Sequence, residues 1–236
     1  MATTAEVRRC TRIHGAPLRT LMFSDHCPGE PGRSRTAPER ATMSRRRNER
    51  KESMHYLSHY ESRLGAMTMA GDGEHLTGLW FDGQKYDRST IDDDAVLQPR
   101  LPVFTQTAQW LDAYFEGADP GFTPPIRVEG SNFKKMVSST MLSIPFGATS
   151  TYARIAAEVA RRMGRKQMSA QAVGGAVGRN PITLIVPCHR VLASDGSLRG
   201  YAGGVDRKER LLEMEGVNMS GLSTPPAADD GGGRRE

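Results

Sequence analysis

Residues 184–191 read Leu-Ile-Val-Pro-Cys-His-Arg-Val, an apolar run of strand-like residues followed by a proline, a cysteine and a histidine. Proline fixes its own φ angle and has no backbone N–H, so Pro187 restricts the chain just before Cys188. A histidine beside a cysteine is a common partner for generating the thiolate, which is the attacking form. A Cys-His pair alone also fits a small buried cysteine with no chemical role. The neighbouring segments decide between the two.

The segment before this run predicts two helices joined by a short turn. A first helix is expected from Thr151 to Met163 with Ser150 as its N-cap, and a second runs through Val177 with Ser169 as its N-cap. This order is the outline of a helix-turn-helix. The second helix is rich in Gly and Ala, which fits either tight helix packing or docking in a minor groove about 6 Å wide.

Three segments in order, 169–181 (SAQAVGGAVGRNP), 184–191 and 200–208 (GYAGGVDRK), resemble the O6-alkylguanine-DNA alkyltransferases, also called methylated-DNA–protein-cysteine methyltransferases. The resemblance is strong over Asn132 to Gly216 and looser over Met54 to Val128. It implies a ribonuclease-H-like α/β N-terminal domain. It also implies a mainly α C-terminal domain with a helix-turn-helix, similar to a winged helix.

The resemblance also implies an activity. The alkyl group of O6-alkylguanine, and of O4-alkylthymine, is transferred once and irreversibly to Cys188 of the protein itself. The partner is double-stranded DNA, approached from the minor groove with the damaged base flipped out of the helix. The protein acts as a monomer without a cofactor or a metal.

The resemblance assigns roles to individual residues. Cys188 matches the nucleophile, and His189 matches the base that acts on it through a water. Glu215 orients His189, and Asn180 organises the turn between the second helix and the cysteine. Contacts with DNA or with the flipped base are implied for Tyr152, Gln171, Arg190, Val191, Tyr201, Ala202 and Lys208.

Two of these positions depart from many relatives. Gln171 stands where an arginine often fills the space left by the flipped base; glutamine is neutral, but it is planar and long enough to insert. Ala202 stands where some relatives have a serine. Because the contact attributed to that position is a backbone N–H, the exchange should change little.

Charge supports a polyanionic partner. Residues 151–210 contain eleven Lys or Arg and four Asp or Glu, a net charge of +7, whereas the whole chain of 236 residues carries +5. This basic segment contains the Cys-His pair, and positive charge attracts nucleic acid. A merely solvated basic face would also explain the charge, but not its coincidence with the Cys-His pair.

The sequence lacks the features of secreted and membrane proteins. No apolar run reaches the roughly 20 residues that span a membrane, and no apolar secretory signal is present. The three cysteines are widely spaced, which fits a reducing compartment better than a disulfide framework. We therefore expect a cytoplasmic protein, or one located in the nucleoid or nucleus with the DNA.

Four regions are expected along the chain. Residues 1–53 are predicted to be a disordered basic extension, unless translation begins at Met43 or Met54. Residues 54–128 form an α/β supporting domain, 129–218 the alkyltransferase and DNA-binding domain, and 219–236 a disordered tail. Strands are predicted at 56–60, 64–70 and 75–81, and helices at 105–115 and 132–142.

Other interpretations of these residues fit the sequence less well. Cys10, His14, His26 and Cys27 lack a recognised zinc-ligand spacing, and residues 92–94 fit an exposed acidic loop better than a metal site. A damage-sensing relative without repair activity would lack Cys188. A sequence-specific transcription factor needs base-reading side chains that the second helix lacks. A thiol hydrolase needs a separate catalytic histidine region.

Overall fold

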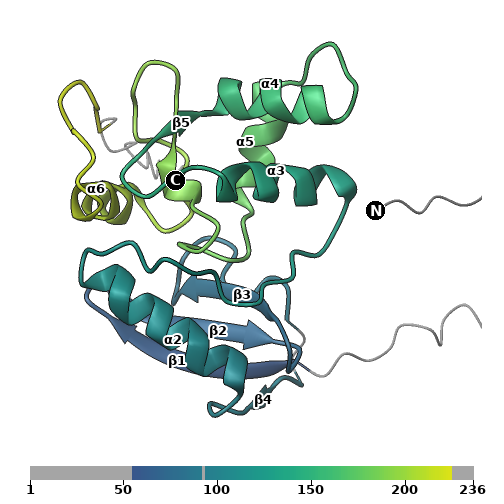
Figure 1. Ribbon diagram of the computed structural model, residues 1–236, viewed down its shortest axis with the longest axis vertical. Helices are drawn as coiled ribbons and strands as arrows, with labels where there is room; N and C mark the ends of the chain where they lie inside the picture. Colours follow the sequence, from purple (N-terminus) through teal and green to yellow (C-terminus); the bar gives the residue numbers. More distant parts are fainter. Residues whose placement is uncertain (1–54, 92–93, 225–236) are drawn as a thin grey trace, which may run out of the picture. The chain divides into compact units, whose positions relative to one another are not determined.

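The computed structural model describes residues 55–91 and 94–224 (Figure 1). Strands β1 (Tyr56–Ser62), β2 (Gly65–Gly71) and β3 (Leu76–Phe81) form an antiparallel meander, and β4 (Val96–Leu97) pairs in parallel with β1. The strand order is β3-β2-β1-β4. The first three strands confirm the predicted ones within two residues at each end. We did not predict β4, because two exposed residues carry no alternation.

Helix α2 (Pro102–Phe115) lies across one face of this sheet (Figure 1). It begins at Pro102, earlier than the predicted 105, because proline at the first helical position loses no intrahelical hydrogen bond. Its buried side chains include Phe104, Leu111 and Tyr114. We call β1 to β4 and α2 together the sheet region.

Helices α3 (Asn132–Leu142), α4 (Tyr152–Arg162) and α5 (Ala170–Gly178) follow. The predicted bounds of α3 are confirmed, and Ser169 caps α5 by accepting from the Ala172 N–H. The predicted cap of α4 was wrong: the hydroxyl of Thr151, one residue later than Ser150, accepts from the Arg154 N–H. Both residues form the short strand β5 (Ser150–Thr151), and Thr151 is the one directly before the first helical residue, Tyr152.

The apolar run before Cys188 is not a strand, which corrects the strand-like interpretation. It forms a turn, in which Leu184 has a positive φ of 70° and the Val186 N–H donates to the Ile182 carbonyl. The short helix η1 (Cys188–Arg190) and strand β6 (Val191–Leu192), parallel to β5, come next, followed by α6 (Val205–Met214). We call α3 to α6 with their connections the helical region.

Backbone hydrogen bonds join the helical region to the sheet region. The Leu79 N–H donates to the Pro181 carbonyl at 2.8 Å, and the Thr183 N–H donates to the Leu79 carbonyl at 2.9 Å. Residues 125–127 bond to Leu76 in the same manner. Segments 125–127 and 181–183 therefore cover the outer edge of β3. A single apolar core runs through both regions and includes Cys188.

Residues 219–224, the first part of the predicted tail, pack against the protein. Met219 and Leu222 pack on a small cluster around Leu212, and the Leu198 N–H donates to the Ser223 carbonyl at 3.0 Å. Residues 1–53, the cysteines and histidines within them, Asp92, Asp93 and residues 225–236 lie outside the described residues. Among the described helices, none combines the length and apolar character needed to cross a membrane.

Candidate active site

Cys188 begins η1 and is only 5% exposed. The side-chain amide of Asn180 donates to its Sγ at 3.1 Å and to the Val186 carbonyl at 2.7 Å. The carbonyl oxygen of that amide accepts from the Ile182 N–H at 3.1 Å. One buried amide thus closes the turn and holds the thiol.

Burial raises the pKa of the Cys188 thiol, because a charged thiolate is poorly solvated there. The hydrogen bond from Asn180 and the positive charge of Lys208 act in the opposite direction without overcoming burial. The thiol is therefore protonated at neutral pH and needs a base to become a nucleophile.

His189 follows Cys188 and is completely buried. Its Nε2 lies 2.7 Å from Oε1 of Glu215, whereas its Nδ1 has no hydrogen-bond partner among the described residues. Burial lowers the pKa of His189 against the raising effect of the Glu215 carboxylate, so the imidazole is neutral at neutral pH. A proton on Nε2 satisfies the carboxylate and leaves the lone pair on Nδ1.

Glu215 is the C-cap residue of α6, and its side chain is fully buried. Oε2 accepts from Nε of Arg190 at 2.8 Å and from the Gly147 N–H at 3.2 Å, and Oε1 accepts from Nη2 of Arg190 at 3.0 Å. Burial acts to raise the pKa of Glu215, but hydrogen bonds and charges from His189 and Arg190 outweigh it and hold the pKa at about 2.

Arg190 lies inside the protein, and its predicted contact with DNA stays a prediction. The residue is 7% exposed, and its remaining Nη1 donates to the Ile144 carbonyl at 2.7 Å. All three guanidinium nitrogens are therefore used inside the protein. The ion pair with Glu215 compensates for the desolvation of both charges.

Lys208 is also buried, and its Nζ donates to the Val191 carbonyl at 2.6 Å. Burial lowers the pKa of Lys208 to about 8, although the neighbouring Cys188 acts to raise it. The ammonium thus faces the site from inside the protein. Val191, predicted to meet the flipped base with its carbonyl, is itself buried in β6.

Two of the predicted base-contact residues, Tyr201 and Ala202, line a cavity of about 280 Å³ beside α5. Tyr152, at the start of α4, lies nearby and donates from its hydroxyl to the Arg199 carbonyl at 3.4 Å. Burial raises the pKa of Tyr152 to about 12, so its hydroxyl stays protonated. Gln171 lies exposed in the first turn of α5. The cavity is lined by Lys85, Tyr86, Gly174, Gly175, Gly178, Arg179, Gly200, Tyr201 and Ala202.

Sequence reasoning missed the contribution of the sheet region. The Lys85 N–H donates to the Ala202 carbonyl at 3.2 Å, and the Arg179 guanidinium lies 5.6 Å from the centre of the Tyr86 ring. The hydroxyl of Tyr114 donates to Oε1 of Glu215 at 2.7 Å. The weak signal in the sequence was that a tyrosine buried on a helix needs a polar partner.

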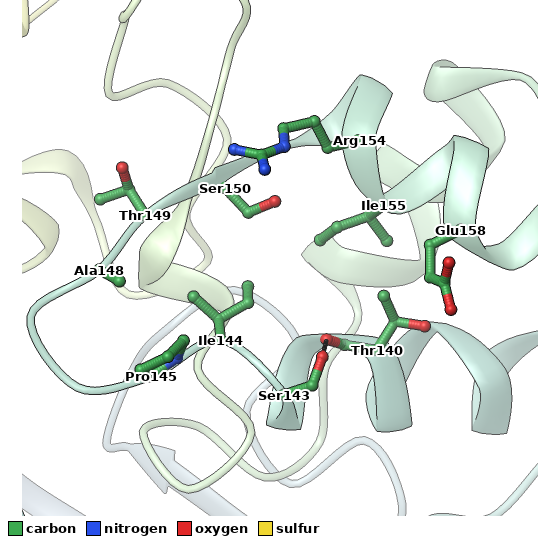
Figure 2. A pocket seen from close by; sticks show the side chains of 10 residues that line it. All are labelled: Thr140, Ser143, Ile144, Pro145, Ala148, Thr149, Ser150, Arg154, Ile155 and Glu158. Carbon is green, nitrogen blue, oxygen red and sulfur yellow. Dashed lines mark hydrogen bonds between the residues drawn. The ribbon is translucent and has the colours of Figure 1, made fainter.

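A second cavity of about 260 Å³ lies between α3 and α4 (Figure 2). Arg154 and Glu158 extend from α4 at its rim, and hydroxyl groups face it from α3 and β5 (Figure 2). None of the residues predicted for catalysis or DNA contact lines it. The lining residues are Thr140, Ser143, Ile144, Pro145, Ala148, Thr149, Ser150, Arg154, Ile155 and Glu158.

Two family profiles match consecutive parts of the chain. Residues 55–128 match the ribonuclease-like domain of 6-O-methylguanine DNA methyltransferase, and residues 132–217 match its DNA binding domain. The first match contains the sheet region, and the second contains Cys188 and its neighbours.

The curated proteins similar to this chain have the same name. A methylated-DNA–protein-cysteine methyltransferase of Methanosarcina acetivorans is 40% identical over 68% of this chain and 98% of its own length. One from Mycobacterium tuberculosis is 38% identical over 69% and 92%. Among solved structures, Mycobacterium tuberculosis OGT in complex with DNA is 36% identical with a TM-score of 0.59, covering 69% of this chain and 92% of that one.

Proposed function

This chain belongs to the 6-O-methylguanine DNA methyltransferase family and repairs DNA by alkyl transfer to a protein cysteine, and we propose that the acceptor is Sγ of Cys188. The observation that carries this assignment is a pair of buried hydrogen bonds on adjacent residues, Asn180 to Cys188 and His189 to Glu215. Cys188 is also a free thiol, as the reaction requires.

His189 serves as the general base. Its unprotonated Nδ1 takes the thiol proton through a bridging water, and Glu215 stabilises the imidazolium that forms. The Lys208 ammonium stabilises the thiolate. The unpartnered Nδ1 supports this role because it is free to accept a proton, and the raised pKa of Cys188 supports it because the thiol needs a base.

The transfer step is a displacement at the alkyl carbon. The sulfur–carbon bond forms as the carbon–O6 bond breaks, and the bonding electron pair leaves on the guanine. The guanine then takes up one proton, which balances the proton lost by the thiol. The product is a thioether without a good leaving group, so each molecule reacts once.

DNA is the partner, and we assign its contact to the minor groove through α5. The helix presents Ala172, Gly174, Gly175 and Gly178, and these small residues fit a groove about 6 Å wide. The cavity beside α5 receives the damaged base after it flips out of the duplex. Tyr201 and Ala202 form its wall, Tyr152 drives rotation of the nucleotide, and Gln171 fills the vacated space.

Helices α4 and α5 serve as the helix-turn-helix of a winged-helix-like domain. The protein acts as a monomer in the compartment that holds the DNA, the cytoplasm with its nucleoid or the nucleus. Double-stranded DNA with O6-alkylguanine, or with O4-alkylthymine, is the substrate, and no cofactor takes part.

Mass spectrometry tests the assignment. The protein is incubated with a duplex that contains O6-methylguanine, digested and sequenced by fragmentation. We expect one additional CH₂ group on the peptide that contains Cys188, and none in Cys188→Ala, which should still bind the duplex. Methylation of another residue would refute the acceptor. Binding without methylation would indicate a damage sensor.

A further inference from the structure

Tyr114 lies at the C-terminal end of α2, in the sheet region, and enters the hydrogen-bond network around His189. Its hydroxyl donates to Oε1 of Glu215 at 2.7 Å and lies 3.2 Å from Nε2 of His189. The residue is completely buried. Both partners belong to the helical region, so these contacts connect the two regions at the active site.

Aromatic packing fixes the Tyr114 ring. Trp110 stacks on it with centroids 5.1 Å apart, and Phe146 meets it edge to face at 6.0 Å. The His189 ring is also edge to face, with centroids 6.3 Å apart. Because these rings hold the tyrosine on several sides, its hydroxyl is fixed relative to Glu215 and His189.

The hydrogens in this network have one consistent arrangement. Burial and the Glu215 carboxylate raise the pKa of Tyr114 well above its usual value, so the hydroxyl is always a donor. The ionised carboxylate only accepts, so the 2.7 Å contact with Nε2 requires a proton on that nitrogen. The lone pair of His189 is then on Nδ1.

We propose that Tyr114 is a positioning residue for alkyl transfer, whose hydroxyl holds Glu215 so that His189 keeps its proton on Nε2 and its lone pair on Nδ1. This inference rests on the proposed roles of Cys188 and His189. It makes the sheet region part of the reactive centre, beyond the supporting role that its sequence suggested.

The hydroxyl also sets how basic His189 is. By donating to Oε1, Tyr114 shares the negative charge of Glu215, which weakens the pull of the carboxylate on the imidazolium. Loss of the hydroxyl strengthens that pull and favours the protonated imidazole, which cannot accept the thiol proton. The titratable groups around His189 that enter this balance are Cys188, Arg190, Tyr201, Lys208, Tyr114 and Glu215.

The test compares Tyr114→Phe with Tyr60→Phe. The hydroxyl of Tyr60 also donates to a carboxylate, Asp112, at 2.8 Å, but at the surface and outside the network. Single-turnover transfer from an O6-methylguanine duplex is measured from pH 5 to 9, together with thermal unfolding. For Tyr114→Phe we expect transfer about tenfold slower at neutral pH, or about 1.4 kcal/mol of activation free energy. The acid limb of its pH–rate profile should move to higher pH by about half a unit. The transfer rate and pH profile of Tyr60→Phe should match those of wild type.

A second variant separates positioning from folding. Site-specific 3-fluorotyrosine at position 114 keeps the ring and the hydroxyl but makes the hydroxyl a stronger donor, so the acid limb should move downward. Nitrogen NMR of His189 should show the proton on Nε2 in wild type. Opposite shifts for the two variants support the inference. A Tyr114→Phe protein that is folded and has the wild-type rate and pH profile overturns it, as do equal shifts in both variants. Failure of the proposed function would be recognised separately, because wild type itself would take up no methyl group.

Discussion

Replacing Glu215 with glutamine should lower the stability of the protein markedly at neutral pH. The carboxyl has a pKa near 4.5 in an unfolded chain and about 2 in the folded protein, so its charge contributes about 3 kcal/mol to the free energy of unfolding. Loss of one partner from a buried ion pair costs about 3–5 kcal/mol, because Arg190 keeps an uncompensated charge. The two magnitudes agree.

The pH dependence follows from the lowered pKa of Glu215. The contribution is complete above about pH 4.5 and disappears as the pH falls toward 2, because protonation of Glu215 then removes the charge that Arg190 and His189 bind. The difference between wild type and Glu215→Gln should therefore be largest at neutral pH and should narrow in acid.

Urea unfolding and thermal unfolding, each followed by circular dichroism and tryptophan fluorescence at pH 7 and pH 3, measure both effects. At pH 7 a loss of about 3 kcal/mol lowers the Tm by roughly 6–12 °C for a chain of this size. Glu158→Gln is the control: the pKa of Glu158 is also lowered to about 2 by Arg161 and Arg162, but the group remains open to solvent. We expect little change there.

Two results would refute this reasoning. One is a loss of less than about 1 kcal/mol for Glu215→Gln at pH 7, which is the range of an exposed pair. The other is a difference from wild type that stays constant between pH 7 and pH 3. Adding Arg190→Met to Glu215→Gln should recover part of the loss, because it removes the unpaired buried cation.

Three further predictions concern DNA contact and the chain ends. Gln171→Gly should slow transfer from duplex DNA but react normally with free O6-benzylguanine, because only the duplex needs the space filled; equal slowing of both reactions would contradict the placement of Gln171. Gly200→Ala should slow transfer and lower the free energy of unfolding by about 1–3 kcal/mol, because Gly200 has a φ of +88° and a Cβ there would lie 2.7 Å from the Tyr152 hydroxyl. Unchanged kinetics and unfolding would contradict this. Deletion of residues 1–53 should leave one methyl per molecule in the mass spectrum and weaken DNA binding only at low salt; a folded but inactive protein would contradict it.

Local patterns explain how much of the fold was predictable. Strands β1 to β3 contain residues that favour strands, and Gly71-Asp72-Gly73 marks the turn between β2 and β3. Helices α3 and α5 have serine N-caps. The positions of these elements therefore follow from neighbouring residues alone. Residues 184–186 have the composition of a buried strand, yet they form a turn. The decisive interactions come from the side chain of Asn180, which no periodicity reveals.

The residues of the site also divide into those that local sequence could predict and those that it could not. Cys188, His189 and Asn180 could be proposed from the sequence because they lie in two neighbouring motifs, 169–181 and 184–191. Tyr114 was missed because it lies 75 residues before His189 and 101 before Glu215, in a helix whose pattern is satisfied by core packing. The DNA contact that the resemblance implies for Arg190 stays a prediction. Its buried ion pair with Glu215 was not predicted, because the partner lies 25 residues later in the chain.

The cover over β3 has a consequence for aggregation. Segments 125–127 and 181–183 bond to an edge strand whose residues are all buried and mostly apolar. If residues 181–183 detached, free N–H and C=O groups of that strand would face other molecules, and such edges pair readily with further chains. The turn that carries the reactive cysteine thus also protects the protein from self-association. Substitutions that loosen Asn180 should therefore yield insoluble protein as well as inactive protein.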